Sequence, residues 1–172
     1  MQSYLVNGSS SLLFVISTIK AFYSSNLIIW KMSNMFLIVA SFLCNANNYD
    51  LVFLLLDYFA IYLACISYLN NMYINSLYTL SLIYEYTKYN SIDNMKNLAF
   101  ATALGKCVIN TYLYVDTTHL YIVFTSSACG LVVYKIRNYL HETNNTKYKV
   151  LLTYLFHFCV MNIMYVSSIT AM

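Results

Sequence analysis

Residues 51–69 read LVFLLLDYFAIYLACISYL, an almost unbroken apolar stretch with a single charged residue, Asp57. A helix needs about 20 such residues to cross the hydrocarbon core of a bilayer. A carboxylate inside that core is costly and is usually kept for a structural or functional reason. This stretch therefore predicts a membrane-spanning helix and a first candidate functional residue.

Similar apolar stretches fill most of the 172-residue chain. The stretches at 8–24 and 72–88 are the weakest candidates, because the first contains Lys20 and the second ends in Glu85 and Lys88. Five or six crossing helices are therefore alternatives to seven. The candidate spans are 8–24, 27–46, 50–69, 72–88, 95–114, 118–138 and 148–170.

The composition agrees with a polytopic membrane protein. The chain is 60% apolar and only 9% charged, with a mean hydropathy of +0.61. A soluble domain carries roughly 25% charged residues, so this chain lacks the groups to cover a water-facing surface. The net charge of +3, without any run of Lys and Arg, excludes nucleic acid as an expected partner.

The connections between the stretches are short and polar, so successive helices must run antiparallel and side by side. The sequence therefore predicts an all-α polytopic transmembrane bundle of seven helices with short loops, forming one domain over residues 1–172. The five cysteines all lie in apolar stretches and form no CxxC motif, which indicates buried free thiols. They are Cys44, Cys65, Cys107, Cys129 and Cys159.

The sidedness of the bundle is indicated by two signals that disagree. Seven spans put the N-terminus and the loops at 46–50, 89–95 and 139–147 on one side. That side collects most of the basic residues: Lys88, Lys96, Lys135, Arg137, Lys147 and Lys149. The positive-inside rule then predicts a cytosolic N-terminus. The glycosylation sequons at Asn7 and Asn144 lie on the same side and favour the opposite orientation.

Five polar residues inside the spans form a candidate intramembrane cluster. Ser41 and Asn45 are four residues apart and therefore share one helix face, as do Thr153 and His157. Together with Asp57 they give three helices a polar face. One interpretation is a pocket where Asp57 and His157 meet, to bind an ion or polarise a water. The other is a set of interhelical hydrogen bonds, worth about 0.6 kcal/mol each.

Other polar residues point less clearly to function. Lys106 lies in the middle of a span, so it either extends toward the membrane surface or pairs with Asp116 near the next helix. His119 follows Asp116 at a helix entrance, and His141 lies in a polar loop. We expect both histidines to be solvated.

These polar positions resemble those of a seven-helix superfamily that includes alkaline ceramidases, progestin and adiponectin receptors, haemolysin-III-like proteins and the muscle fusion factor myomaker. Its members typically show Ser-x-x-x-His in helix two, an acidic residue in helix three and His-x-x-x-His in helix seven. Ser41-Phe-Leu-Cys-Asn45 is similar to the first motif. The segment LDYFAIY around Asp57 is similar to the second, especially in its myomaker-like form. Thr153-Tyr-Leu-Phe-His157 is similar to the third.

The departures from these motifs bear on chemistry. In hydrolytic members of the superfamily three histidines hold zinc, and the acid and the serine organise the zinc-bound water. Here Asn45 and Thr153 replace two of those histidines. Catalytic zinc ordinarily needs three protein ligands. The resemblance therefore implies this superfamily's fold, whereas the substitutions predict no bound metal, no cofactor and no catalytic residues.

Three functions are compatible with the sequence. The first is a non-enzymatic, myomaker-like membrane protein of the plasma membrane or secretory pathway, which acts on membranes in cell–cell fusion or lipid remodelling. The second is an accessory membrane subunit of a mitochondrial respiratory or ATP-synthase complex, which the small size and the Tyr- and Asn-rich, Pro-free composition suit. The third is a ceramidase-like lipid hydrolase with an altered site. The expected partners are membrane lipids and other membrane helices or subunits.

Overall fold

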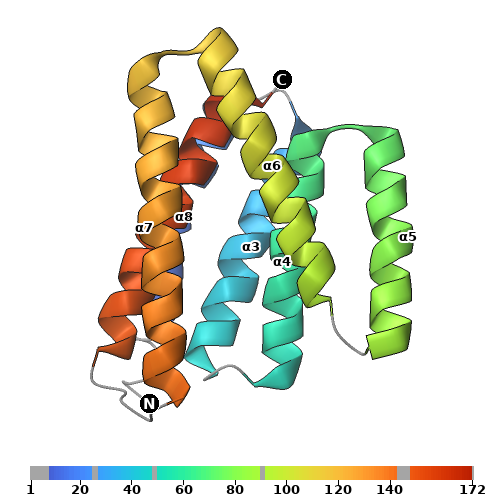
Figure 1. Ribbon diagram of the computed structural model, residues 1–172, viewed down its shortest axis with the longest axis vertical. Helices are drawn as coiled ribbons and strands as arrows, with labels where there is room; N and C mark the ends of the chain where they lie inside the picture. The colour runs from blue at the N-terminus through green and yellow to red at the C-terminus, as the bar shows by residue number, and fades with distance from the viewer. Residues whose placement is uncertain (1–7, 25–26, 48–49, 90–91, 143–147, 172) are drawn as a thin grey trace.

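The computed structural model describes residues 8–24, 27–47, 50–89, 92–142 and 148–171 (Figure 1). These residues form a short 3₁₀ helix and seven α-helices, and no strand occurs among them. The structure thus confirms the predicted all-α bundle. Its elements are η1 (Ser10–Leu13), α2 (Phe14–Ser24), α3 (Ile28–Ala46), α4 (Leu51–Leu69), α5 (Met72–Tyr89), α6 (Asp93–Tyr114), α7 (Thr117–Glu142) and α8 (Lys149–Thr170).

The helices run up and down in chain order, so each is antiparallel to the next (Figure 1). Helix α8 packs against α2, α6 and α7, and α4 packs against α3 and α6. Helix α5 lies at the right edge of the view and touches the bundle only lightly, through α6 and α4. The core of the molecule therefore lies among α2, α3, α4, α6 and α8.

Four helices are long and apolar enough to cross a membrane, which identifies the chain as a helical membrane protein. They cover Ile28–Ala46, Leu51–Leu69, Thr117–Arg137 and Val150–Thr170. The stretch Ser10–Ser24 is apolar but shorter. Helix α5 is not apolar enough to be counted with these four, in agreement with the weakness of the candidate span 72–88. The same holds for helix α6, because it carries several polar residues, among them Lys96, Asn97, Lys106 and Asn110.

The basic residues are distributed unevenly between the two ends of the bundle. At the lower end in Figure 1 lie the starts of α4, α6 and α8 and the ends of α3, α5 and α7. Ser11 of η1 contacts Ser41 near this end of α3. Lys88, Lys96, Lys135 and Arg137 lie in the helix turns near this end, as the loop assignment predicted. Lys20 and Lys31 lie near the upper end. Both sequon asparagines, Asn7 and Asn144, fall outside the described residues.

Small residues of α7 face its neighbour α8 within the bundle. A Cβ added at Gly130 would stand 3.3 Å from the Cβ of Cys159, so glycine allows the close approach of the two helices. One turn earlier, the Ser126 hydroxyl accepts a hydrogen bond of 3.3 Å from the Asn162 amide. Because Ser126 and Gly130 lie four residues apart on one helix face, this face of α7 packs against α8.

Candidate functional site

The first two cluster residues meet at the lower end of α3. The Asn45 amide donates 2.7 Å to the backbone carbonyl of Ser41 and lies 3.4 Å from its hydroxyl. Ser11 of η1 donates to the Ser41 hydroxyl at 3.1 Å. All three side chains are buried. The predicted polar face of this helix therefore exists, and its partner is the 3₁₀ helix at the start of the described chain.

The serine run at residues 9–11 was not identified from the sequence as part of the cluster. Ser11 contacts α3, whereas Ser9 shares a hydrogen bond with the Tyr154 hydroxyl of α8. Ser10 is fully buried, and its backbone hydrogen-bonds the ring of His157. Three consecutive hydroxyl residues within an apolar stretch were the available signal. This run links the polar faces of α3 and α8.

His157 and Thr153 are buried on one face of α8, as their spacing predicted. The imidazole stacks against Phe14 and Phe156, with ring centroids 5.0 and 6.0 Å away. Its Nδ1 atom is shielded and has no hydrogen-bond partner. His157 is therefore held mainly by aromatic packing, with the contact to Ser10 as its polar anchor.

Asp57 lies in the second turn of α4, beside the lower end of α3. Its carboxyl group neighbours the Ser41 hydroxyl, and its Oδ1 atom is buried without a partner. Lys96 of α6 exerts the strongest attraction on this carboxylate, and Arg137 of α7 adds to it. Because a carboxylate in an apolar environment is costly, these cations determine whether its charge is tolerated.

Lys96 is a central residue of the site that sequence reasoning placed only among the loop charges. It is 8% exposed, and its Nζ donates 2.6 Å to Oδ1 of Asp93 in the same helix turn. The ammonium group also stands 3.5 Å from the ring centroid of Tyr58, the residue after Asp57. The i,i+3 spacing of Asp93 and Lys96 was an available signal for an ion pair on one helix face, but it carries no information about Tyr58 or Asp57.

The pocket in which Asp57 and His157 meet, one of the two interpretations of the polar cluster, is not seen as a direct contact. Within the described residues no hydrogen bond or ion pair joins them, and the buried Oδ1 and Nδ1 atoms remain without partners. The polar residues instead form two groups at the lower end, one around Ser41 and Asp57 and the other around His157. The contacts are those of the other interpretation, interhelical hydrogen bonds, and the η1 serines make them with both α3 and α8.

The donor atoms of this cluster do not fit the zinc site that the superfamily resemblance implies. Asn45 offers only a neutral amide oxygen, since its amide nitrogen is a donor and binds the Ser41 carbonyl, and Thr153 offers only a hydroxyl. His157 would be a single nitrogen ligand, whereas catalytic zinc takes three protein ligands. Among the described residues, no group of three or more His, Cys, Asp or Glu side chains is placed to hold a metal ion.

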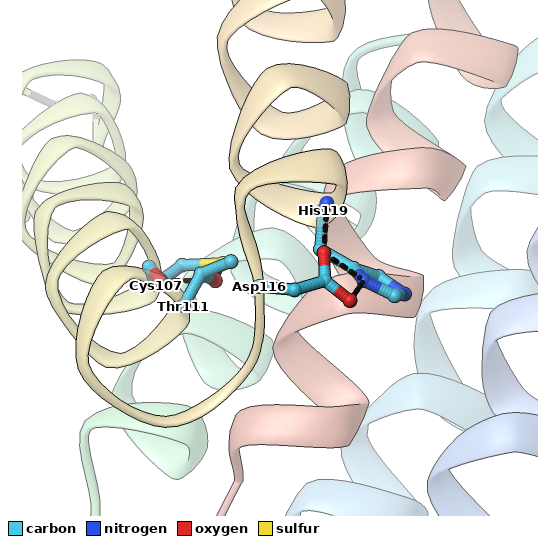
Figure 2. Close-up of polar contacts among 4 residues, drawn as sticks. All are labelled: Cys107, Thr111, Asp116 and His119. Atoms are coloured by element: carbon cyan, nitrogen blue, oxygen red, sulfur yellow. Dashed lines mark hydrogen bonds and ion pairs between the residues drawn. The ribbon is translucent and has the colours of Figure 1, made fainter.

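Near the upper end, polar side chains form hydrogen bonds with the backbone at helix ends. Lys106 donates 2.8 and 2.9 Å to the backbone carbonyls of Tyr68 and Leu69, the last residues of α4. Its predicted alternative partner, Asp116, instead receives hydrogen bonds of 2.8 Å from the backbone N–H and 2.9 Å from Nδ1 of His119 (Figure 2). The Lys106–Asp116 pair was therefore a wrong expectation, because Lys106 reaches toward α4.

The thiols have no role in these contacts that indicates catalysis. All five cysteines are free, and four of them are buried, whereas Cys129 is exposed on the outer face of α7. The Cys107 thiol stands 4.0 Å from the Thr111 hydroxyl, which donates to the Cys107 carbonyl at 2.6 Å (Figure 2). This local contact belongs to helix packing.

No protein-family model matches this chain, and neither the curated proteins nor the solved structures include a match.

Proposed function

We propose that this chain is a non-enzymatic multi-pass membrane protein of the myomaker-like branch, which acts on membranes in cell–cell fusion or lipid remodelling. The observation that carries the proposal is the contact between the first two motif positions. Ser41 lies beside both Asn45 and Asp57, whereas His157 of α8 is joined to them only through the serines of η1. The proposal rests on the resemblance of the short sequence motifs, and the contact between Ser41 and Asp57 supports it.

The donor chemistry supports a function without hydrolysis. The amide of Asn45 and the hydroxyl of Thr153 occupy positions where the hydrolytic members have zinc-binding histidines. Asp57 has Lys96 and Arg137 as its positively charged neighbours. A carboxylate balanced by protein cations serves to hold helices together, and it leaves no ligand set for metal-assisted attack on a lipid.

The outer surface supports action on lipid or on other membrane helices. Large apolar side chains are exposed on α5 and α7, including Leu77, Leu80, Leu131 and Val132. Such side chains suit contact with acyl chains. The plasma membrane or secretory pathway is the proposed residence.

A cell-mixing experiment tests this proposal. Two cell populations with different cytosolic dyes would both express the chain, with surface biotinylation to measure its delivery. We expect content mixing above that of cells without the chain, and reduced mixing for Asp57→Asn. Cys129→Ser, a change on the exposed face of α7, is the matched control and should mix normally. Surface-delivered protein that mixes no contents would overturn the proposal.

The peripheral position of α5 favours a second candidate, an accessory subunit of a mitochondrial respiratory or ATP-synthase complex. Only Glu85 is buried among the residues of this helix, so nearly all of its circumference is open to helices of a larger assembly. Fractionation of the same cells distinguishes the two. Residence in the mitochondrial inner membrane and co-migration with a respiratory or ATP-synthase complex would favour the subunit.

A further inference from the structure

Helix α5 contacts the rest of the bundle along one narrow stripe. Ile74, Tyr78 and Leu82 are partly buried against the core, and Glu85 continues the same face one turn later. Away from this stripe the side chains of Leu77 and Leu80 are each 65% exposed. In lipid, apolar surface alone does not drive helices together, because acyl chains are as apolar as leucine. The polar contacts of α5 therefore contribute much of the free energy that holds it against α4 and α6.

Glu85 makes the strongest of these contacts. Its side chain is 5% exposed, and its two carboxylate oxygens accept hydrogen bonds of 2.9 and 2.8 Å from the backbone N–H groups of Asn94 and Met95. These N–H groups belong to the first turn of α6, where a helix has no internal acceptors. The positive end of the helix dipole also favours a carboxylate there.

The remaining polar contacts of α5 with the bundle are between neutral hydroxyl groups. Tyr78 shares a hydrogen bond of 2.6 Å with Thr102 of α6, and Thr79 lies 3.4 Å from the hydroxyl of Tyr62 in α4. A charge-assisted hydrogen bond is roughly twice as strong as a neutral one. Glu85, with two such bonds, is therefore the dominant polar attachment of α5.

We propose that Glu85 is a latch that holds α5 on the bundle, and that α5 detaches from α6 while the other helices stay packed. The latch goes beyond the proposed membrane function, because it would operate in either candidate assembly. Its release opens the side of the bundle formed by α4 and α6, where Tyr62 and Thr102 contact α5. In this proposal α5 is the helix that moves relative to the rest of the bundle.

Hydrogen–deuterium exchange of the full chain in nanodiscs of neutral phospholipid tests the latch. We expect Glu85→Ala to raise the exchange rate of α5 and of the first turn of α6 by roughly tenfold or more, because two backbone N–H groups of α6 lose their acceptor. The amides of α3, α4 and α8 should keep their protection. Glu85→Gln, which retains one acceptor oxygen without the charge, should give a smaller increase at the same places.

Lys88→Ala is the matched control. Lys88 lies one turn from Glu85 on the same helix, is exposed, and donates its hydrogen bond within α5 to the Tyr84 hydroxyl. Its exchange pattern should equal that of the native chain. Unchanged exchange of α5 in Glu85→Ala would overturn the proposal. Equal loss of protection in all helices would also overturn it, because Glu85 would then stabilise the whole fold.

Discussion

The two ends of the bundle satisfy their charged groups in different ways. At the lower end, the buried charged groups meet charges or a helix N-terminus: Lys96 pairs with Asp93 and attracts Asp57, and Glu85 caps α6. At the upper end, two lysines meet neutral groups. Lys106 binds two backbone carbonyls, and Lys20 lies 5.6 Å from the ring centroid of Tyr165.

This difference decides whether replacing one charged residue destabilises another. A cation bound to carbonyls or to a ring can be replaced without leaving an opposite charge behind. Removing the Lys96 ammonium leaves Asp57 in an apolar environment with one fewer counter-charge. The lower end is therefore where single substitutions should be most damaging and where paired substitutions should compensate.

The largest expected effect is that of Lys96→Met. We expect the free energy of unfolding to fall by about 3 kcal/mol, near the low end for breaking a buried ion pair, because Arg137 remains near Asp57. Unfolding by detergent titration would measure it. The double variant Asp57→Asn with Lys96→Met should recover much of the loss, and Lys88→Met, an exposed lysine on α5, is the control. Strictly additive losses would contradict the coupling.

Lys106→Met probes the corresponding cation of the upper end. Two carbonyls at the end of α4 would lose their donor, with an expected loss of about 1–3 kcal/mol for leaving such groups unsatisfied. The matched control is Lys20→Met, which removes only a cation–π contact and should cost about 0.5–1 kcal/mol. The same detergent titration measures both. A smaller loss for Lys106→Met than for Lys20→Met would contradict the assigned role.

Two interhelical hydroxyl pairs allow the strength of uncharged hydrogen bonds to be compared between the two ends. Ser11 and Ser41 are 3.1 Å apart at the lower end, and Ser33 and Ser67 are 2.7 Å apart at the upper end. Double-mutant cycles with alanine should give a coupling of about 0.6 kcal/mol for each pair. A much larger coupling at Ser11–Ser41 alone would indicate that the neighbouring Asp57 strengthens this network.

Much of the fold was predictable because apolar runs alternate with short polar connections. The stretch at 27–46 became α3, Ile28–Ala46, and 50–69 became α4, Leu51–Leu69. The stretch at 118–138 was too short for α7, which continues to Glu142. Hydropathy marks the hydrocarbon boundary, whereas a helix continues beyond it when polar residues such as His141 still favour helical backbone.

The candidate site was predictable on each helix but not between helices. Spacing of four residues placed Ser41 with Asn45 and Thr153 with His157, because that spacing is fixed by helix geometry. The partners across helices, Ser11 and Lys96, depend on the rotation of each helix about its axis. The sequence pattern does not fix that rotation when most faces are apolar, so it could not decide whether Asp57 and His157 meet.

The smallest effect is expected at the exposed turn between α6 and α7, where Asp116 caps α7. Hydrogen bonds from the backbone and side chain of His119 hold the pKa of Asp116 below its ordinary value of 3.8. A lowered carboxyl pKa contributes stability that is fully present above the ordinary pKa and is lost as pH falls through the lowered one. Melting temperature followed into the acid range should therefore decline less steeply in Asp116→Asn than in the native chain. Identical slopes for the two proteins would contradict the cap, and because the site is open to solvent we expect only a small difference.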